Sequence, residues 1–290
     1  MQRINLGLYA QRALSVFLVL LLVSCNAFNF GSKKKEKGNL VLISTNMGDM
    51  KVFLYDETPL HKANFLRLVD SSYYDNMLFH RVIKGFMIQG GDPNSRNAPP
   101  DRIIGSGGPG YTIPAEISRG LIHKKGALAG AREGDQANPE KRSSGSQFYI
   151  VQGQIYPKSE MDNFSQSIDY NTKMKCLQDL LYSPEHAKTL AEIQRAQQNK
   201  QNIRYDSLIH SFDPLTEAYL DSVGRHQFTE YQKEIYSTIG GAPHLDGGYT
   251  VFGELVEGMD VLDRIAALKT NQFDRPMQDV VIFGMKRVKK

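Results

Sequence analysis

Residues 79–92 read Phe-His-Arg-Val-Ile-Lys-Gly-Phe-Met-Ile-Gln-Gly-Gly-Asp, and this stretch decides how the rest of the chain is interpreted. Two short runs of strand-forming residues, 78–83 and 86–89, are separated by a break at Gly85. Arg81 lies inside the first run and carries a charge that cannot be titrated away in a protein. Taken alone, an arginine in this setting fits an exposed strand face as well as it fits a binding site.

Short strand patterns separated by turns recur from Leu40 to the end of the chain. The other predicted strands cover residues 40–43, 50–54, 126–131, 147–151, 250–255 and 280–288. One helix is predicted to begin after Thr58-Pro59, which supply a capping hydroxyl and a first-turn proline, and to end near Asp70. A second is predicted over residues 259–268. Many short strands with two separate helices predict a closed or nearly closed antiparallel barrel whose open ends the helices cover.

A change of composition marks an insertion at residues 155–240. The chain has 25 glycines, but none lies between Gln154 and Val223. Apolar residues at helical spacing and several helix-start signals occur in this stretch: Met174, Leu177 and Leu181, then Ser183-Pro184, Asp213-Pro214 and the capping-box pattern Thr229–Gln232. We therefore predict three or four helices here.

The first residues are typical of a secretory signal peptide, predicted over 1–24. Arg3 and Arg12 precede an apolar run that is too short to span a bilayer. Residues 22–25, Leu-Val-Ser-Cys, resemble a bacterial lipobox, which predicts cleavage before Cys25 and a lipid anchor on that residue; the alternative is an ordinary signal peptide with an incidental cysteine. Residues 25–38 are predicted to be a tether. We expect a protein of the bacterial cell envelope, anchored by lipid to a membrane and facing the periplasm.

Composition excludes some functions. The net charge is only +4, from 35 basic and 31 acidic residues, which is far from the concentrated basic field of a nucleic-acid-binding protein. The seven histidines show no ligand spacing, so neither a metal nor a cofactor is predicted. With 41% hydrophobic residues the chain can form an ordinary packed core.

Three motifs together resemble the cyclophilin-type peptidyl-prolyl isomerases. They are residues 79–92, Ser-Gly-Ser-Gln-Phe-Tyr-Ile-Val at 144–151, and His-Leu-Asp-Gly-Gly-Tyr-Thr-Val-Phe-Gly at 244–253. The resemblance implies a mainly β fold over residues 39–290: an eight-stranded antiparallel barrel capped by two helices and interrupted in sequence by the helical insertion. It also implies catalysis of rotation about Xaa-Pro bonds in proline-containing polypeptides.

The resemblance assigns residues to that reaction. It implies that Arg81 is the catalytic hydrogen-bond donor, aided by Gln89 and Phe86. The implied substrate-binding positions are Met87, Ala131, Arg132, Gln147, Tyr149, His244, Leu245 and Tyr249. Rotation about the prolyl amide meets a barrier of about 20 kcal/mol, and a donor aimed at the prolyl nitrogen binds the twisted state better than either planar state.

Several positions depart from the best-known eukaryotic members. Tyr149, His244 and Tyr249 stand where those proteins have phenylalanine, tryptophan and histidine, and Arg132 replaces the commoner asparagine. These changes keep an aromatic pocket but add polar tips to it. Strand alternation would place Phe86 and Met87 on opposite faces, so their convergence on one pocket requires the local distortion near Gly85 that the resemblance implies.

The sequence thus favours a lipid-anchored isomerase that acts on unfolded or flexible envelope proteins. The alternative is a peptide-binding holdase in which the insertion carries the function and the barrel is a scaffold. A purely structural lipoprotein would give no reason for the residues around Arg81. No prediction of oligomeric state follows from the sequence.

Overall fold

The computed structural model describes residues 39–289. The predicted signal peptide, the tether and Cys25 fall in residues 1–38 and lie outside the described residues. Within 39–289, none of the helices combines the length and the apolar character needed to cross a bilayer.

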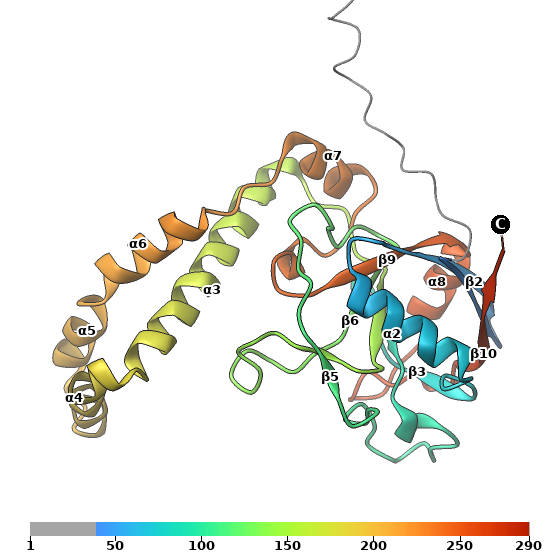
Figure 1. Ribbon diagram of the computed structural model, residues 1–290, viewed down its shortest axis with the longest axis horizontal. Coiled ribbons are helices and arrows are strands. Elements are labelled where there is room, and N and C mark those ends of the chain that lie inside the picture. Colours follow the sequence, from blue (N-terminus) through green and yellow to red (C-terminus); the bar gives the residue numbers. More distant parts are fainter. Residues whose placement is uncertain (1–38, 290) are drawn as a thin grey trace, which may run out of the picture. The chain divides into compact units, whose positions relative to one another are not determined.

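Eight strands close into an antiparallel barrel, which confirms the predicted fold class (Figure 1). Around the barrel they follow the order β1, β10, β3, β4, β8, β6, β9, β2. Their bounds are Leu40–Thr45 (β1), Gly48–Leu54 (β2), Met77–Ile83 (β3), Met87–Gly90 (β4), Ala127–Gly130 (β6), Phe148–Val151 (β8), Val251–Glu257 (β9) and Val281–Val288 (β10). A separate pair, β5 (Thr112–Ile113) and β7 (Ser143–Ser144), was not predicted.

Two helices cover the barrel, as the sequence predicted. They are α2 (Pro59–Asp70) and α8 (Met259–Ala266), whose apolar faces join the same buried cluster as the strands. Phe65 of α2 shows how closely they pack, since its ring lies 5.6 Å from that of Phe148 in β8 and 5.5 Å from that of Phe252 in β9. Burial of these aromatic faces supplies much of the driving force for closing the barrel.

The predicted cap of α2 is wrong in its chemistry. The hydroxyl of Thr58 is buried and has no hydrogen-bond partner among the described residues. Glu116, from a distant loop, takes that role: its carboxylate accepts hydrogen bonds from the backbone N–H groups of Leu60 at 3.0 Å and His61 at 2.9 Å. A negatively charged carboxylate at the helix N-terminus also stabilises the helix, because it lies at the positive end of the helix dipole.

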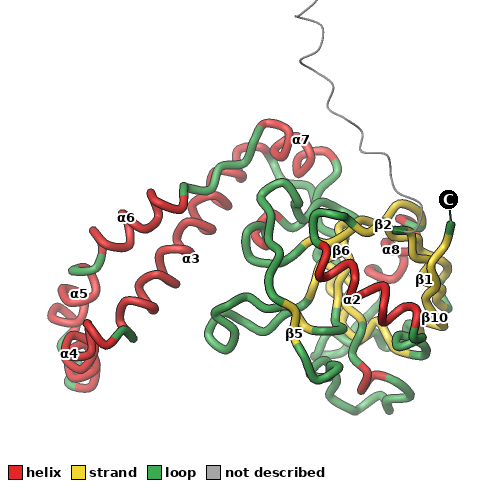
Figure 2. Tube along the Cα trace, in the orientation of Figure 1, coloured by secondary structure: helices red, strands yellow, loops and turns green. Residues whose placement is uncertain are grey.

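The insertion holds five α-helices in the described chain, more than predicted (Figure 2). They are α3 (Met161–Leu181), α4 (Ala187–Gln198), α5 (Asn202–His210), α6 (Asp213–Val223) and α7 (Glu230–Thr238), with short 3-10 turns at Lys158–Glu160 and Pro184–His186. The capping box at the start of α7 is confirmed. Neither Ser183 nor Asp213 forms the predicted cap, because the Ser183 hydroxyl donates to the Leu180 carbonyl and the Asp213 carboxylate pairs with His210.

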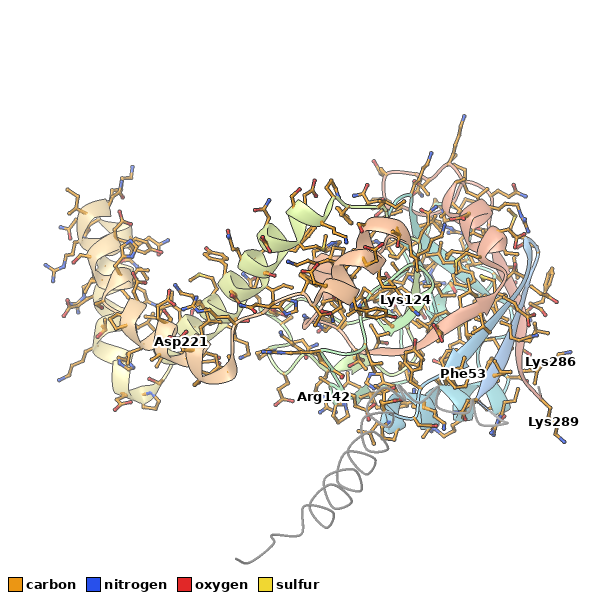
Figure 3. All side chains as sticks on the ribbon, turned by 90° about the horizontal axis from the view of Figure 1, so that it is seen from above. Phe53, Lys124, Arg142, Asp221, Lys286 and Lys289 are labelled. Carbon is orange, nitrogen blue, oxygen red and sulfur yellow. The ribbon has the colours of Figure 1, made fainter. Side chains whose placement is uncertain are left out.

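The two ends of the insertion meet beside the barrel. The backbone groups of Gln154 and Gly241 exchange two hydrogen bonds, at 3.0 and 3.1 Å. Gly153 has φ +65°, and a Cβ there would lie 2.4 Å from the Cα of Gly241, so only glycine fits this crossing. The helices are therefore added to the barrel without breaking its strand order. In Figure 3, Asp221 marks the insertion, and Phe53 and Lys286 mark two strands of the barrel.

Candidate active site

An extra residue in β3 brings Arg81 to the surface of the barrel. Phe79 and Arg81 pair with consecutive residues of β4, so His80 has no counterpart and forms a bulge. As a result Phe79 and Val82 both lie in the barrel core, whereas His80 and Arg81 line a surface cavity. The same bulge sets Arg81 directly opposite Gln89.

This cavity has a volume of about 570 Å³, and we call it the prolyl cavity. It collects nine of the eleven residues that the resemblance assigned: Arg81, Phe86, Met87, Gln89, Ala131, Arg132, Tyr149, Leu245 and Tyr249. They come from β3, β4 and β8 and from the loops after β6 and before β9, which lie side by side only in the folded chain.

Phe86 and Met87 both line the cavity because the chain turns at Gly85. Gly85 has φ +77°, a left-handed conformation that suits glycine, and the N–H of Phe86 donates to the Ile83 carbonyl at 3.0 Å. Phe86 therefore belongs to the turn, and β4 begins only at Met87. This is the local distortion near Gly85 that was expected.

One edge of the cavity is a chain of polar side chains. An Arg81 Nη1 hydrogen points to Gln89 Oε1 at 3.4 Å, and Gln89 Nε2 donates to Gln147 Oε1 at 2.9 Å. Gln147 Nε2 in turn donates to the carbonyls of Gly105 and Gly107, at 2.9 and 2.7 Å. Each amide is held in one orientation, with its donor and acceptor ends fixed.

Asp274 holds the arginine from the other side and was missed by the sequence analysis. Its Oδ2 lies 3.2 Å from Arg81 Nε, and both side chains are 41% exposed. The N–H of Val82 also donates to the Asp274 carbonyl at 2.8 Å, so this loop is tied to β3. Six other lining residues were also not predicted: His80, Ile103, Ile104, Gly105, Ser106 and Phe273. Among them only Ile103 and Ile104, an apolar pair before a glycine-rich turn, gave any signal in the sequence.

Two assigned residues lie just outside the prolyl cavity. Gln147 acts on it only through Gln89. His244 packs its ring 5.3 Å from that of Phe86 and lines a neighbouring groove instead. Burial lowers the pKa of His244, so its ring is neutral near pH 7 and serves as a flat apolar support.

Tyr149 begins a buried hydrogen-bond network behind the cavity wall. Its hydroxyl lies 3.0 Å from His123 Nε2, and His123 Nδ1 lies 2.7 Å from Asp246 Oδ1. The other oxygen of Asp246 accepts from the Tyr236 hydroxyl at 2.5 Å. An aspartate carboxylate can only accept, so His123 Nδ1 is the donor in its contact with Asp246. Burial raises the pKa of Tyr149 well above its usual value, so the phenol stays protonated.

Tyr236 belongs to α7, which means that the insertion supplies the last member of this network. All site residues that were predicted from the sequence lie outside residues 155–240, and the sequence carries no signal for this contact. The Tyr149 hydroxyl, the polar group that a phenylalanine at this position would lack, faces His123 in the protein interior.

Arg132 forms a ridge at the cavity rim. Its guanidinium lies 4.3 Å from the centre of the Tyr249 ring, and its Nε donates to the Gly248 carbonyl at 2.8 Å. Both backbone groups of Ala131 are engaged, with Gln147 and Ser144. The backbone N–H and C=O of Arg132 form no hydrogen bond within the described chain, so the peptide edge expected at these two residues is available at Arg132.

The arrangement suits non-covalent binding of a proline. Apolar faces of Phe86, Met87 and Leu245 fit a pyrrolidine ring, and the donors of Arg81 and Gln89 lie along one side. In residues 39–289 there is no group of three or more His, Cys, Asp or Glu side chains that could hold a metal ion.

Comparisons with known proteins agree with this geometry. The model of the family "Cyclophilin type peptidyl-prolyl cis-trans isomerase/CLD" matches residues 40–211 and 221–287. A Staphylococcus haemolyticus protein named for peptidyl-prolyl cis-trans isomerase activity is 31% identical over 243 residues, which cover 83% of this chain and 87% of that protein. A Streptococcus pyogenes protein, named for both phosphatase and isomerase activity, is 32% identical over 252 residues, covering 86% of this chain but only 38% of the longer relative.

Solved structures show the same fold. A crystal structure of a Cryptosporidium parvum cyclophilin-type isomerase superposes with a TM-score of 0.51 at 21% identity, covering 88% of this chain and 99% of that one. The closed barrel, the family model and the relatives of similar length lead to one conclusion: this chain belongs to the cyclophilin-type peptidyl-prolyl cis-trans isomerases, a family of enzymes.

Proposed function

We propose that the prolyl cavity catalyses rotation about Xaa-Pro bonds of unfolded or flexible polypeptides, with Arg81 as the hydrogen-bond donor to the prolyl nitrogen. The observation that carries this proposal is the pairing of Arg81 with Gln89 in a cavity that also presents the apolar side chains of Phe86, Met87 and Leu245. Phe86, Met87 and Leu245 would hold the ring, and the flanking peptide would turn against this fixed anchor.

Arg81 suits the chemistry because its fork is already oriented. Asp274 accepts from Nε and does not engage the two Nη nitrogens, one of which lies beside Gln89. As the amide twists, the nitrogen lone pair is released from resonance and becomes an acceptor. A donor that meets it there stabilises the transition state more than either planar ground state, which is the condition for rate enhancement.

The remaining polar groups would hold the peptide backbone. Gln89 is fixed by Gln147, and Arg132 offers an unengaged N–H and C=O at the rim. When both segments that flank the proline are held, the substrate is bound in fewer orientations, and the entropic cost of reaching the reactive geometry is met on binding.

Exchange NMR on a short Ala-Pro peptide tests this function. Added in catalytic amounts, the chain from Gly38 onward should raise the rate of cis–trans exchange well above the uncatalysed process, which takes tens of seconds or longer. An unchanged exchange rate with folded protein would show that the cavity is not an active site.

We also propose that the enzyme is a lipoprotein of the bacterial cell envelope, held at a membrane by lipid on Cys25 and facing the periplasm. The support is the sequence Leu-Val-Ser-Cys at 22–25, followed by a short tether. Several acyl chains, at about 0.8 kcal/mol per buried methylene, bind a membrane durably. Cys25→Ser should move the protein from the membrane to the soluble fraction; salt-resistant membrane association of this variant would contradict the anchor.

A further inference from the structure

A second cavity of about 600 Å³ borders the prolyl cavity, and we call it the insertion groove. One wall comes from α3 and α6 of the insertion and includes Ile168, Lys175 and Tyr219. The other comes from the loop 134–141 and from residues 244–248. Arg132, Leu245 and Tyr249 line both cavities, so the groove continues directly from the prolyl cavity.

Arg132 lies at the boundary between the two cavities, and several contacts hold its side chain in place. Arg132 stacks on Tyr249, bonds to Gly248 and pairs with Asp135 at 2.6 Å, and only 5% of its side chain is exposed. A polypeptide that leaves the prolyl cavity in this direction passes Arg132 and enters the groove. Its backbone would meet the unengaged N–H and C=O of Arg132 on the way.

The insertion wall is fixed to the barrel at its base. The side chain of Arg119 donates to the Gly224 carbonyl at 2.8 Å, and Gln232 donates back to the Arg119 carbonyl at 2.9 Å. Ile122, from the barrel side, packs into a cluster with insertion residues that include Tyr236. The groove is therefore a built surface rather than a chance gap beside a loose segment.

One cation of the groove, Lys141, is not neutralised by a direct ion pair. Lys141 Nζ donates to the Gly247 carbonyl at 3.2 Å but forms no ion pair within residues 39–289. The acidic groups near it are already engaged, since Asp135 pairs with Arg132 and Asp179 with Lys175. Burial lowers the pKa of Lys141, Asp135 opposes this effect, and Arg132 and Lys175 lower the pKa further.

Glu140 also faces this groove, but its side chain is 75% exposed and lies 3.8 Å from Arg142, so it does not neutralise Lys141. Three basic and three acidic side chains line the groove, and the acidic ones are Asp135, Glu140 and Asp246. Lys141 is the basic one that forms no ion pair in the described chain, so an acidic ligand would find its partner there, with Ile168 and Tyr219 as apolar contacts beside it.

We propose that the insertion groove binds one of the two segments that flank the proline of a polypeptide substrate, and that it prefers an acidic side chain there, received by Lys141. This inference rests on the proposed function, because it takes the prolyl cavity as the place where the substrate proline is held. It gives the insertion a role in selecting substrates, separate from the bond rotation itself.

Peptides of different length test the inference on the unaltered full chain. A short blocked peptide with an Ala-Pro core is compared with longer ones that extend it on the N-terminal or the C-terminal side, each with either glutamate or lysine in the extension. Affinity is measured by NMR titration and turnover by exchange NMR. We expect one glutamate-extended peptide to bind about tenfold more tightly than both the short peptide and its lysine-extended match, with the gain falling as salt is raised.

Variants identify the site. In Lys141→Gln the tenfold gain should disappear, whereas Lys188→Gln, at an exposed lysine on α4, should retain it. Equal affinities for the short and the extended peptides, or a gain that survives in Lys141→Gln, would overturn the proposal that the groove binds substrate. An equal gain with glutamate and lysine extensions would overturn its acidic preference. Failure to turn over the short peptide would instead refute the proposed function, so the two failures are distinguishable.

Discussion

Replacing Tyr236 by phenylalanine removes one hydroxyl from the network that joins the insertion to the wall of the prolyl cavity. Tyr236 is fully buried, and its hydroxyl donates to Asp246, which is only 6% exposed. The variant keeps the ring and its packing but leaves one carboxylate oxygen without that donor. Hydrogen bonds to charged groups contribute about 1.5–3 kcal/mol, so we expect a loss of stability of that size.

In a domain of this size each kcal/mol shifts the melting temperature by about 2–4 °C, so Tyr236→Phe should lower it by about 3–12 °C. The matched control is Tyr231→Phe on the same helix, where the side chain is 71% exposed and the expected change is close to zero. Chemical denaturation gives the free energies of unfolding for both.

A double-mutant cycle with Tyr149→Phe tests whether the network acts as one unit. Tyr149 and Tyr236 both connect to Asp246, one through His123 and one directly. Bonds in such a chain polarise one another, so the two substitutions should couple by at least about 0.5 kcal/mol. Effects that add within experimental error, or a Tyr236→Phe protein as stable as the Tyr231→Phe control, would refute the network as a link between insertion and cavity.

Two further predictions concern other buried groups. Glu116→Gln should destabilise the fold by about 1–2 kcal/mol in chemical denaturation, because the charged cap of α2 is lost, whereas Glu230→Gln on the exposed start of α7 should cost less. Burial lowers the pKa of His80 to about 4, so below pH 6.5 the unfolded chain takes up a proton on this side chain while the folded chain does not. Between pH 7 and pH 4 the native protein should therefore lose up to about 3 kcal/mol more stability than His80→Phe. Parallel profiles of stability against pH for the two proteins would contradict this.

The barrel could be predicted from the sequence because strand alternation and turn residues are local signals. Most of the site could be assigned because its residues cluster in three short motifs. The bulge at His80 could not, because alternation in the sequence gives no sign of a residue without a partner. It is this bulge that turns Arg81 toward the cavity.

The supporting contacts were also beyond the sequence. Asp274 lies 193 residues from Arg81, and Glu116 lies 56 from the helix start that it caps. Tyr236 is near Asp246 in sequence, but its burial depends on how the insertion packs against Ile122. Each of these contacts is made by side chains whose neighbours are set only by the tertiary fold.

The most direct measurement of the central claim compares isomerase kcat/KM on a short Xaa-Pro peptide for the native chain, Arg81→Ala, Arg81→Lys and the control Arg195→Ala, an exposed residue of α4. The Asp274 ion pair is half-exposed and contributes at most about 1 kcal/mol, so the Arg81 variants should fold. We predict that Arg81→Ala lowers kcat/KM at least tenfold, that lysine restores little of it because it lacks the planar fork, and that Arg195→Ala has no effect. Native activity in a folded Arg81→Ala protein would contradict the mechanism.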